Sequence, residues 1–598
     1  MKYIDSKTGY FICDTSADPL RGVNVSAEEV RSALSSYILS ASGWRNVFAS
    51  SKNEEDAGET ISDADSVICA AVAKVFYEEL GKENAKVLLA VDARPTGRIL
   101  SYITMRVLCA LGADVTYLFI SAAPETMAYS HAGFDAFCYI SASHNPIGHN
   151  GFKFGYDGGV YERSISDRLA DALRDCISHD DVTQEMKKLS AAADESVLDR
   201  ILSHYTQDKA EALSYYRDFV LKTAGVTPSF RADCGIVGEL NGSARSLSID
   251  EEFLSSIGCR THYVNNKAGA VVHAIVPEGE NLIPCRDELK KCYDSDHSFI
   301  LGYCPDNDGD RGNFVYIKES TGESLILEAQ EVFALVVAIE LADLSYRKTQ
   351  NLAVAVNCPT SERIDRIAEC FGARVFRAEV GEANVVNLAA KLRDEGYVVH
   401  ILGEGSNGGN ITDPAKVRDP LNSIMSVLKL FADENLYRYA VEKLTGEKCE
   451  DKPSIEGLIN ALPVYTTTGA FSKLAKMYVR HTAWAELKKE YEKLFVLQWQ
   501  NMHFEEEGIV SYEVHQTEGV NEVTGIGEKF RSPAAKGGLK MILLDKDGNH
   551  VAYMWLRPSG TESVLRVLVD VKGKKEALHD RLLSWQRSLI DEADKALD

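Results

Sequence analysis

The sequence predicts an α/β protein in which three similar α/β domains precede an α+β C-terminal domain. Three observations support this prediction. Short apolar, β-branched runs alternate with amphipathic stretches, the same alternation recurs along the chain, and its character changes near residue 450. Because domains average about 150 residues, a chain of 598 residues suits about four of them. We expect their boundaries at 1–209, 210–318, 319–450 and 451–598.

The expected elements follow the chain in order. The first domain should hold strands joined by a helix: Val87–Val91, Ile99–Leu111, Asp114–Phe119 and Ala136–Ile140. The second should hold a helix and two strands: Ala210–Lys222, Ser298–Gly302 and Asn313–Tyr316. The third should alternate helix and strand: Glu328–Ala342, Asn351–Val356, Ser361–Phe371 and Tyr397–Leu402. The last should hold a long charged helix, a strand–turn–strand and a terminal helix: Lys473–Gln498, His550–Val571 and Lys574–Ala596.

The charge balance narrows the classes of partner. The chain carries 65 Lys and Arg against 89 Asp and Glu, a net charge of −24. This acidity argues against nucleic acid or an anionic membrane, but it leaves anionic small molecules open, because they need only a local cluster of donors. The N-terminus has no signal-peptide pattern, and no apolar run reaches the roughly 18 residues of a membrane span. Thirteen scattered cysteines, without a CxxC pair, are interpreted as reduced core thiols of a cytoplasmic protein.

A loop of small hydroxyl residues directly follows the strand Ala136–Ile140. Its sequence, SASHNP, spans residues 141–146. A serine on a tight loop after a strand can expose its Oγ to a substrate, and His144 could orient or deprotonate such an oxygen. The alternative is a polar turn capped by serine and asparagine.

An acidic loop, DNDGDRG at 306–312, lies between two expected strands. Asp306, Asp308 and Asp310 occupy alternate positions around a glycine, so their carboxylates can converge on one hard cation such as Mg²⁺. An EF-hand is excluded because its sixth and twelfth positions would be Arg311 and Ile317 rather than Gly and Glu. The alternative is an acidic surface turn.

A glycine-rich loop, GEGSNGGN at 403–410, follows the strand that ends at Leu402. It matches the dinucleotide pattern G-x-G-x-x-G, which would suit an NAD-type oxidoreductase if a helix began near Gly405. Pro414 lies too close for such a helix, so we favour a loop in which Glu404 and Ser406 bind the hydroxyls of a sugar. A plain glycine-rich turn is the further alternative.

A fourth loop, RPSGTE at 557–562, connects the last two expected strands. An arginine fork, two hydroxyls and a glycine form a site suited to phosphate, and Arg566 on the following strand could add a second charge. The alternative is an ordinary hairpin.

In this order and on this α/β background, the four loops resemble those of the α-D-phosphohexomutases, a family that includes phosphoglucomutase and phosphomannomutase. The matching motifs are SASHNP, DNDGDR, GEGS and RPSGTE. Weaker matches are SGWR at 42–45, DAR at 92–94 and NGFK at 150–153. The matches run from about residue 40 to residue 566, so the resemblance spans most of the chain.

The resemblance implies a heart-shaped enzyme in which the four domains contribute, in turn, a phosphoserine loop, a metal loop, a sugar loop and a phosphate loop. It implies that hexose 1-phosphate and hexose 6-phosphate, of glucose or mannose, are interconverted through a phosphoserine and a hexose 1,6-bisphosphate. Mg²⁺ would be the cofactor and the bisphosphate an activator. Small-molecule sugar phosphates would be the partners. The charge and the hydropathy lead us to expect neither nucleic acid nor membrane, and the oligomeric state stays open.

The resemblance also implies roles for individual residues. Ser143 would carry the phosphoryl group and contact the Mg²⁺ held by Asp306, Asp308 and Asp310. Charge or proton transfer would come from four residues: Arg45, His144, Lys153 and Arg311. Glu404 and Ser406 would bind the sugar 3- and 4-hydroxyls. The phosphate that is not reacting would be bound by Arg557, Ser559, Gly560, Thr561 and Arg566.

The chain departs from the family pattern where many members carry a histidine at the end of the sugar loop, because Gly408 stands there. The acid/base role of that histidine cannot be carried over, and either His144 or Lys153 could replace it. An amino-sugar phosphate mutase is an alternative, because Glu404 and Ser406 bind hydroxyls far from C2. A non-catalytic sugar-phosphate-binding protein is a third hypothesis, which the presence of Ser143 and all three aspartates disfavours.

Overall fold

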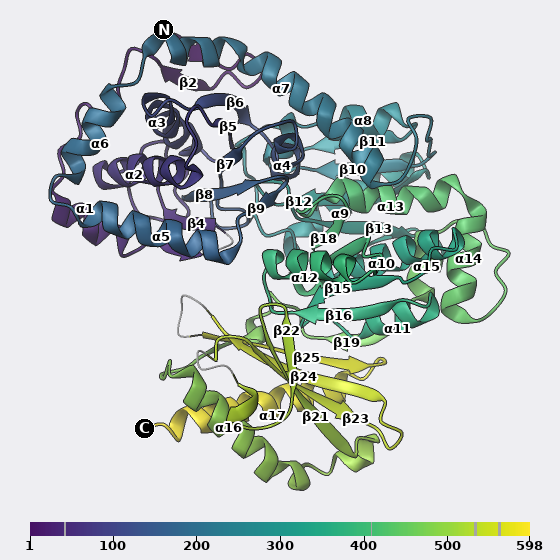
Figure 1. Ribbon diagram of the computed structural model, residues 1–598. Helices are drawn as coiled ribbons and strands as arrows, with labels where there is room; N and C mark the ends of the chain where they lie inside the picture. Colours follow the sequence, from purple (N-terminus) through teal and green to yellow (C-terminus); the bar gives the residue numbers. More distant parts are fainter. Residues whose placement is uncertain (41–42, 408, 532–534, 560–563) are drawn as a thin grey trace. The chain divides into compact units, whose positions relative to one another are not determined.

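The computed structural model describes residues 1–40, 43–407, 409–531, 535–559 and 564–598 (Figure 1). These residues form two compact units. The first unit comprises residues 1–326 and 414–425, and the second comprises residues 327–413 and 426–598. Both units combine helices with sheets, which confirms the predicted α/β class.

The first unit begins with the small hairpin β1 (Lys2–Ile4) and β2 (Phe11–Asp14), followed by a large sheet of order β3-β4-β8-β7-β5-β6 with β9 paired to β8. Its strands are β3 (Ile38–Ser40), β4 (Gly43–Val47), β5 (Lys86–Val91), β6 (Asp114–Ile120), β7 (Ala136–Ile140), β8 (His149–Tyr156) and β9 (Gly159–Val160). Its helices are α1 (Ala27–Leu34), α2 (Asp63–Leu80), α3 (Gly97–Ala110), α4 (Ala123–Ser130), α5 (Arg163–Ser178), α6 (Val182–Ala191) and α7 (Glu195–Thr223). The strands β5 and β7 are apolar and almost fully buried, because helices such as α3 and α4 pack on them.

The second sheet of the first unit has the order β11-β10-β12-β13-β14. Its strands are β10 (Gly235–Glu239), β11 (Arg260–Val264), β12 (Phe299–Pro305), β13 (Gly312–Lys318) and β14 (Glu323–Ile326). The helices α8 (Asp250–Ser256) and α9 (Ile283–Ser295) belong to it, and α9 packs on β10, β12, β13 and β14.

The second unit begins with a sheet of order β16-β15-β17-β18. Its strands are β15 (Ala353–Asn357), β16 (Arg374–Ala378), β17 (Ile401–Glu404) and β18 (Gly409–Thr412). The helices α10 (Ala329–Tyr346), α11 (Arg363–Cys370) and α12 (Glu382–Asp394) pack against it. Three more helices follow: α13 (Pro420–Ala432), which begins in the first unit, α14 (Glu434–Thr445) and α15 (Ile455–Ala461).

These three sheets share one arrangement, which explains the recurring sequence pattern. In each, a central strand (β5, β10 or β15) lies between two parallel neighbours, and an antiparallel strand (β8, β13 or β18) follows the second of them. The serine loop, the acidic loop and the glycine-rich loop each connect that second parallel strand to the antiparallel one. All three loops therefore extend from carboxyl ends of parallel strands, where α/β proteins place their ligand sites.

The C-terminal part of the second unit is built on an antiparallel sheet of order β19-β25-β24-β23-β21-β22, with β20 also paired to β25. Its strands are β19 (Tyr465–Thr467), β20 (Lys476–Tyr478), β21 (Ser511–Glu518), β22 (Asn521–Thr524), β23 (Gly538–Leu544), β24 (His550–Pro558) and β25 (Val564–Lys572). The helices α16 (Trp484–Trp499) and α17 (Glu576–Lys595) pack against each other, and α17 covers β24 and β25.

The structure corrects two predicted elements and extends another. The strand expected at Tyr397–Leu402 begins only at Ile401 and continues to Glu404. The region Lys473–Gln498 is not one helix, because Lys476–Tyr478 pairs with β25 as the strand β20 and the helix begins only at Trp484. The β-branched Val479 and Thr482 suit an extended chain, and pairing with a neighbouring strand outweighs helix propensity here. The predicted helix Ala210–Lys222 is the C-terminal half of the longer α7.

All thirteen cysteines are free thiols, and ten of them are buried. Within the described part of the chain, no helix combines the length and the apolarity needed to cross a bilayer.

Candidate functional site

Ser143 lies on the loop between β7 and β8 with its side chain pointing at the acidic loop. Its Oγ donates to Asp306 Oδ2 at 2.9 Å and lies 3.5 Å from His144 Nδ1. The residue is 1% exposed and holds the left-handed backbone conformation (φ +53°), which is rare for a residue with a side chain. The hydroxyl is thus held in one place beside a carboxylate.

Arg94 holds the serine loop in this conformation. It is 2% exposed, and its guanidinium donates to four carbonyl oxygens. Those of Ser143 and Asn145 both lie at 2.6 Å and that of His149 lies at 3.2 Å, and the fourth belongs to Pro146. Its Nε donates to Asp92 at 3.1 Å. The DAR motif is therefore a buried support for the serine loop, because one planar guanidinium supplies donors to four carbonyls.

The three aspartates of the acidic loop converge as predicted. One carboxylate oxygen from each of Asp306, Asp308 and Asp310 lies within 4.8 Å of the other two, and all three residues are buried. Asp308 Oδ1 and Asp310 Oδ1 have no hydrogen-bond partner within the described ranges. Buried, unpaired carboxylate oxygens are costly, so this set fits a hard divalent cation such as Mg²⁺.

Two cationic side chains contact the carboxylates of this cluster. Lys153 Nζ donates to Asp308 Oδ2 at 2.7 Å and lies 3.6 Å from Asp310 Oδ2, and Arg418 donates to Asp310 at 2.9 Å. Burial alone would lower the pKa of Lys153, but the charges of Asp308 and Asp310 outweigh it and raise this pKa. Lys153 is therefore protonated, and the cluster keeps fixed positive charge beside it.

Two arginines predicted for the site lie near the same carboxylates. Burial and then the charge of Arg311 lower the pKa of Arg45, while Asp308 and Asp310 oppose this shift. The Nε atoms of Arg45 and Arg311 have no hydrogen-bond partner among the described residues. Both guanidiniums thus retain donor capacity for an anionic ligand.

His144 is held neutral by its surroundings. Its pKa is lowered well below the usual value by burial and then by the positive charges of Arg311, Arg45 and Arg418. The first unit therefore brings together Ser143, His144, Lys153, Arg45, Arg311 and the three aspartates. A residue that the sequence analysis missed, Arg418, joins them from a distant part of the chain.

In the second unit, Asn357 brings Glu404 and Ser406 together. Asn357 Nδ2 donates to Glu404 Oε1 at 3.1 Å and to Ser406 Oγ at 3.0 Å. Both acceptor residues are 4% exposed. The sequence analysis missed Asn357, although its position at the carboxyl end of β15, next to β17, is a signal that could have found it.

The glycine-rich loop does not have the geometry of a dinucleotide site. A short 3-10 turn, Gly405–Asn407, follows β17, and the strand β18 then returns antiparallel to β17. A dinucleotide fingerprint would require a helix at this point. The oxidoreductase hypothesis is therefore wrong. Gly408, where the family pattern has histidine, lies outside the described residues.

The phosphate loop places two arginines opposite each other. Arg557 on β24 and Arg566 on β25 are directly paired across the strands, and like charges in that position repel. Arg557 forms an ion pair with Glu379, at 3.0 Å from Nη2 and 3.2 Å from Nε. The N–H of Ser559 donates to the carbonyl oxygen of Val564, which joins the two ends of this loop. The predicted binding residues Gly560 and Thr561, like Ser42 of the SGWR motif, lie outside the described residues.

The segment 379–381, which the sequence analysis missed, connects the sugar loop to the phosphate loop. Its Glu379 binds Arg557, and its Gly381 N–H donates to Glu404 Oε1 at 2.7 Å. Two loops about 150 residues apart in sequence thus share one support, which no local motif indicates.

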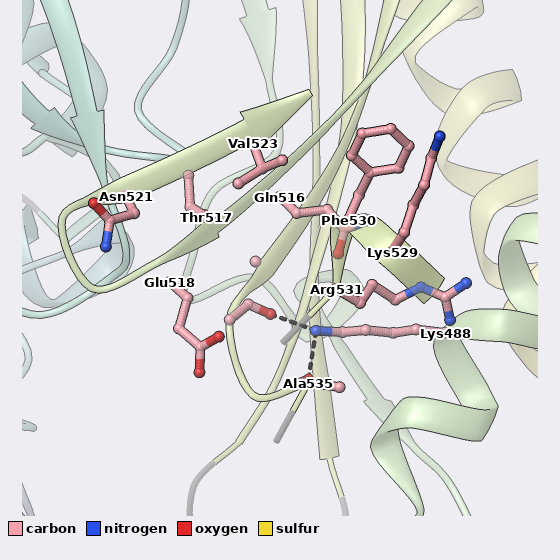
Figure 2. Close-up of a pocket in the computed structure, with 12 residues that line it drawn as sticks. Lys488, Gln516, Thr517, Glu518, Asn521, Val523, Lys529, Phe530, Arg531 and Ala535 are labelled. Carbon is pink, nitrogen blue, oxygen red and sulfur yellow. Dashed lines mark hydrogen bonds between the residues drawn. The ribbon is translucent and has the colours of Figure 1, made fainter. Parts of the chain in front are cut away.

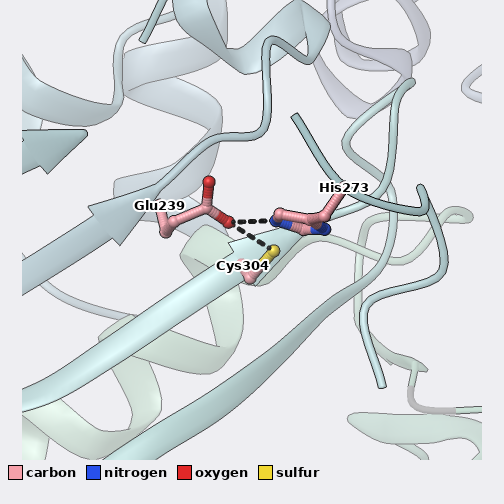
Figure 3. A group of neighbouring side chains, drawn as sticks. All are labelled: Glu239, His273 and Cys304. Carbon is pink, nitrogen blue, oxygen red and sulfur yellow. Dashed lines mark hydrogen bonds and ion pairs between the residues drawn. The ribbon is translucent and has the colours of Figure 1, made fainter. Parts of the chain in front are cut away.

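A second buried polar cluster lies at the base of the acidic loop (Figure 3). Glu239 Oε2 accepts from His273 Nε2 at 2.9 Å and from Cys304 Sγ at 3.1 Å, and Glu239 Oε1 accepts from Asn265 at 2.6 Å. Burial alone would raise the pKa of Glu239 and lower that of His273, but their mutual hydrogen bond reverses both shifts. Through the Cys304 thiol, this cluster contacts the end of β12, two residues before Asp306.

This ion pair makes a pH-dependent contribution to stability. Because the pKa of His273 is raised on folding, its contribution is complete below the unfolded value and is lost as pH rises through the folded pKa. We expect His273→Gln to destabilise the protein by about 1–2 kcal/mol near pH 6 and by much less near pH 9. Melting temperatures of variant and parent, measured at each pH, test this.

His262→Gln is the matched control, because His262 also faces a glutamate at 3.0 Å but its side chain is 43% exposed. Its effect should be small at both pH values. An equal loss for His273→Gln at both pH values would show that the pair contributes through packing alone.

Comparison with known proteins gives a consistent result. A family model described as "Phosphoglucomutase/phosphomannomutase, alpha/beta/alpha domain I" matches residues 41–179, and the corresponding model of domain III matches residues 331–446. A phosphoglucosamine mutase of Methanococcus vannielii is 25% identical over 310 residues, which cover 51% of this chain and 62% of that protein. A phosphoglucomutase/phosphomannomutase of Thermococcus kodakarensis is 26% identical over 356 residues, which cover 59% and 70%.

Solved structures share the fold. A phosphoglucomutase of Paramecium, parafusin, superposes with a TM-score of 0.59 at 14% identity, covering 92% of this chain and 94% of that one. A phosphoglucomutase/phosphomannomutase family protein of Burkholderia thailandensis gives a TM-score of 0.57 at 16% identity, covering 93% and 97%. At these identities the likeness concerns the fold alone.

Proposed function

This chain belongs to the α-D-phosphohexomutase family, and on that basis we propose that it interconverts hexose 1-phosphates and hexose 6-phosphates of glucose, mannose or both. The observation that supports this proposal is the position of Ser143. Its hydroxyl lies 2.9 Å from Asp306 within a carboxylate cluster that fits Mg²⁺, next to four cationic side chains. Phosphoryl transfer needs this combination of positioning and charge neutralisation.

The proposed reaction uses Ser143 as the carrier. The bond between phosphorus and Ser143 Oγ breaks as a bond to the free sugar hydroxyl forms. That hydroxyl loses its proton to a base, and the released Ser143 Oγ takes up a proton, which restores the serine hydroxyl. The product is a hexose 1,6-bisphosphate. After this intermediate reorients in the site, its other phosphoryl group is transferred to Ser143 Oγ.

Each unit contributes different groups to this proposal. Asp306, Asp308 and Asp310 would hold Mg²⁺, which would neutralise charge on the transferring group. Lys153, Arg45 and Arg311 would bind the same oxygens as fixed cations. Because His144 Nδ1 lies 3.5 Å from Ser143 Oγ, we assign proton transfer at that oxygen to His144 rather than to the ion-paired Lys153.

The second unit would bind the sugar. Glu404 and Ser406 would accept and donate hydrogen bonds at the 3- and 4-hydroxyls, while Arg557 and Arg566 would bind the phosphate that is not reacting. We propose that the four domains predicted at 1–209, 210–318, 319–450 and 451–598 each supply one loop. If Arg557 and Arg566 bind the phosphate at either end of the sugar, one serine can exchange a phosphoryl group with both the 1- and the 6-position.

The second candidate is an amino-sugar phosphate mutase, because the relatives include proteins named phosphoglucosamine mutase. The groups that bind the 3- and 4-hydroxyls do not contact C2, so both candidates share the same site chemistry. Glucose 1-phosphate, mannose 1-phosphate and glucosamine 1-phosphate should be assayed in parallel, each primed with its 1,6-bisphosphate. Formation of a 6-phosphate from glucose or mannose supports the first proposal, turnover of glucosamine 1-phosphate alone supports the second, and no turnover contradicts both.

A further inference from the structure

A pocket of about 400 Å³ lies in the C-terminal part of the second unit, in the region 450–540 to which the sequence analysis assigned no function (Figure 2). It is formed by α16, the β21–β22 hairpin and the start of β23. Its polar and charged lining includes Lys488, Gln516, Glu518, Lys529 and Arg531. Figure 2 shows Lys488 extending from α16 across the pocket floor to the chain at Ala535.

Lys488 is a buried cation without an anionic partner. It is 4% exposed, and its Nζ donates to the carbonyl oxygens of Ala535 (2.6 Å) and Gly537 (2.5 Å). Within the described residues, no carboxylate lies at ion-pair distance from this ammonium, and its third N–H has no acceptor. A buried ammonium is costly unless an anion pairs with it.

Two arginines near Lys488 are already paired with carboxylates. Arg531 binds Glu492 at 2.5 Å, and Arg557 binds Glu379 at 3.0 Å. Burial and then the charge of Arg557 lower the pKa of Lys488 to about 7, with Arg531 adding to the shift and Glu379 and Glu518 opposing it. The pocket therefore has an excess of positive charge that an entering anion would satisfy.

Hydrogen bonds connect this pocket to Arg557, the arginine to which phosphate binding is assigned. Glu518 lines the pocket, and the next residue, Gly519, exchanges two hydrogen bonds with Glu379: its N–H donates to the Glu379 side chain at 2.9 Å and its carbonyl accepts from the Glu379 N–H at 2.8 Å. Glu379 in turn holds Arg557. Arg557 is thus connected to the pocket wall through Glu379 and the backbone of Gly519.

We propose that Lys488 is a further phosphate-binding residue: at this pocket, its ammonium binds the same non-reacting phosphate of the hexose phosphate that is assigned to Arg557 and Arg566. The proposal rests on the proposed function. A phosphate monoester is dianionic near neutral pH and offers three acceptor oxygens, which suits one unpaired ammonium beside Arg557. The volume exceeds that of a phosphate group and lies within the usual range for small-molecule sites, so part of the sugar fits as well.

The site makes a specific prediction about protons. At about pH 8 most Lys488 side chains of the free protein are neutral, whereas a bound dianion favours the ammonium. Binding should therefore take up close to one proton for each ligand. A lysine that serves only to hold the carbonyls of Ala535 and Gly537 would take up none.

Calorimetric titration in two buffers of different ionisation enthalpy measures this uptake. Glucose 1-phosphate is the ligand, and a Ser143→Ala chain is used so that no transfer occurs. A second substitution in that chain, Lys488→Met, should abolish the proton uptake. It should also weaken binding at least about tenfold, because one charge-assisted hydrogen bond is lost. Adding Lys493→Met, an exposed lysine of the same helix that pairs with Glu490, should change neither.

The outcomes separate the two proposals. In the otherwise unchanged chain, Lys488→Met should raise KM while kcat is largely retained. If the parent turns over hexose phosphate and the Lys488→Met variant has the same KM as the parent, the pocket assignment is overturned and the proposed function is left intact. If Lys488→Met does not fold, absence of proton uptake by the Ser143→Ala chain overturns the assignment. If no hexose phosphate is turned over while inorganic phosphate binds with uptake, the function fails and the sugar-phosphate assignment fails with it.

Discussion

Replacing Ser143 with alanine is expected to lower kcat for glucose 1-phosphate by a factor on the order of 10⁴ to 10⁶, because the covalent route through Oγ is removed. The substitution deletes one oxygen from a residue that is 1% exposed, so the fold should be retained. Steady-state kinetics measure the loss. Transfer of labelled phosphate from glucose 1,6-bisphosphate to the protein should disappear with it.

Ser141→Ala is the control, because Ser141 is the other loop hydroxyl near the aspartates. Its Oγ donates to Asp308 Oδ2 at 3.0 Å and accepts from the Ser143 N–H at 2.8 Å. It positions the loop, so its removal should cost roughly tenfold in kcat, the value of about one hydrogen bond. Labelling that persists in Ser143→Ala and vanishes in Ser141→Ala would reverse the assignment.

Removing the divalent cation should have the second-largest effect. We expect chelation with EDTA to lower turnover by a factor on the order of 10³ or more, and excess Mg²⁺ to restore it, because a cation held by the three aspartates would supply several kcal/mol of charge stabilisation. Asp308→Asn should not be restored by Mg²⁺. Asp308 offers a buried oxygen without a partner, and its other oxygen also holds Lys153.

Direct titration with Mn²⁺, followed by electron paramagnetic resonance, gives a readout independent of activity. The parent should bind one ion, and Asp308→Asn should bind it much more weakly. Asp287→Asn is the control, because Asp287 is an exposed acid on α9 that forms an ion pair with the neighbouring Arg286. Unchanged Mn²⁺ binding by Asp308→Asn would show that the three-aspartate loop is structural.

The predictions that succeeded rest on local sequence. Residues 136–140 are continuously apolar between polar loops, and the strand β7 has those bounds. Alternate aspartates around Gly309 converge because a glycine in the left-handed conformation turns the chain there. Glu404 and Ser406 are close because they lie two residues apart on one short loop, although the side chain that joins them, Asn357, is distant in the sequence.

The features that sequence reasoning missed depend on contacts distant in the chain. Arg418 reaches Asp310 across 108 positions, and Glu379 reaches Arg557 across 178. No local pattern distinguishes Lys488 from the exposed lysines of α16, because its burial comes from residues 535–537. The strand β20 was missed for the same reason, since its partner β25 is about ninety residues away.

The positive φ of Ser143 has a consequence for protein design. A non-glycine residue in this conformation costs on the order of 1 kcal/mol or more, and Arg94 offsets that cost by fixing the loop carbonyls. Glycine would relax the turn, but it would also remove the hydroxyl that the proposed reaction needs. A thermostabilised version of the protein would therefore best leave this bend untouched.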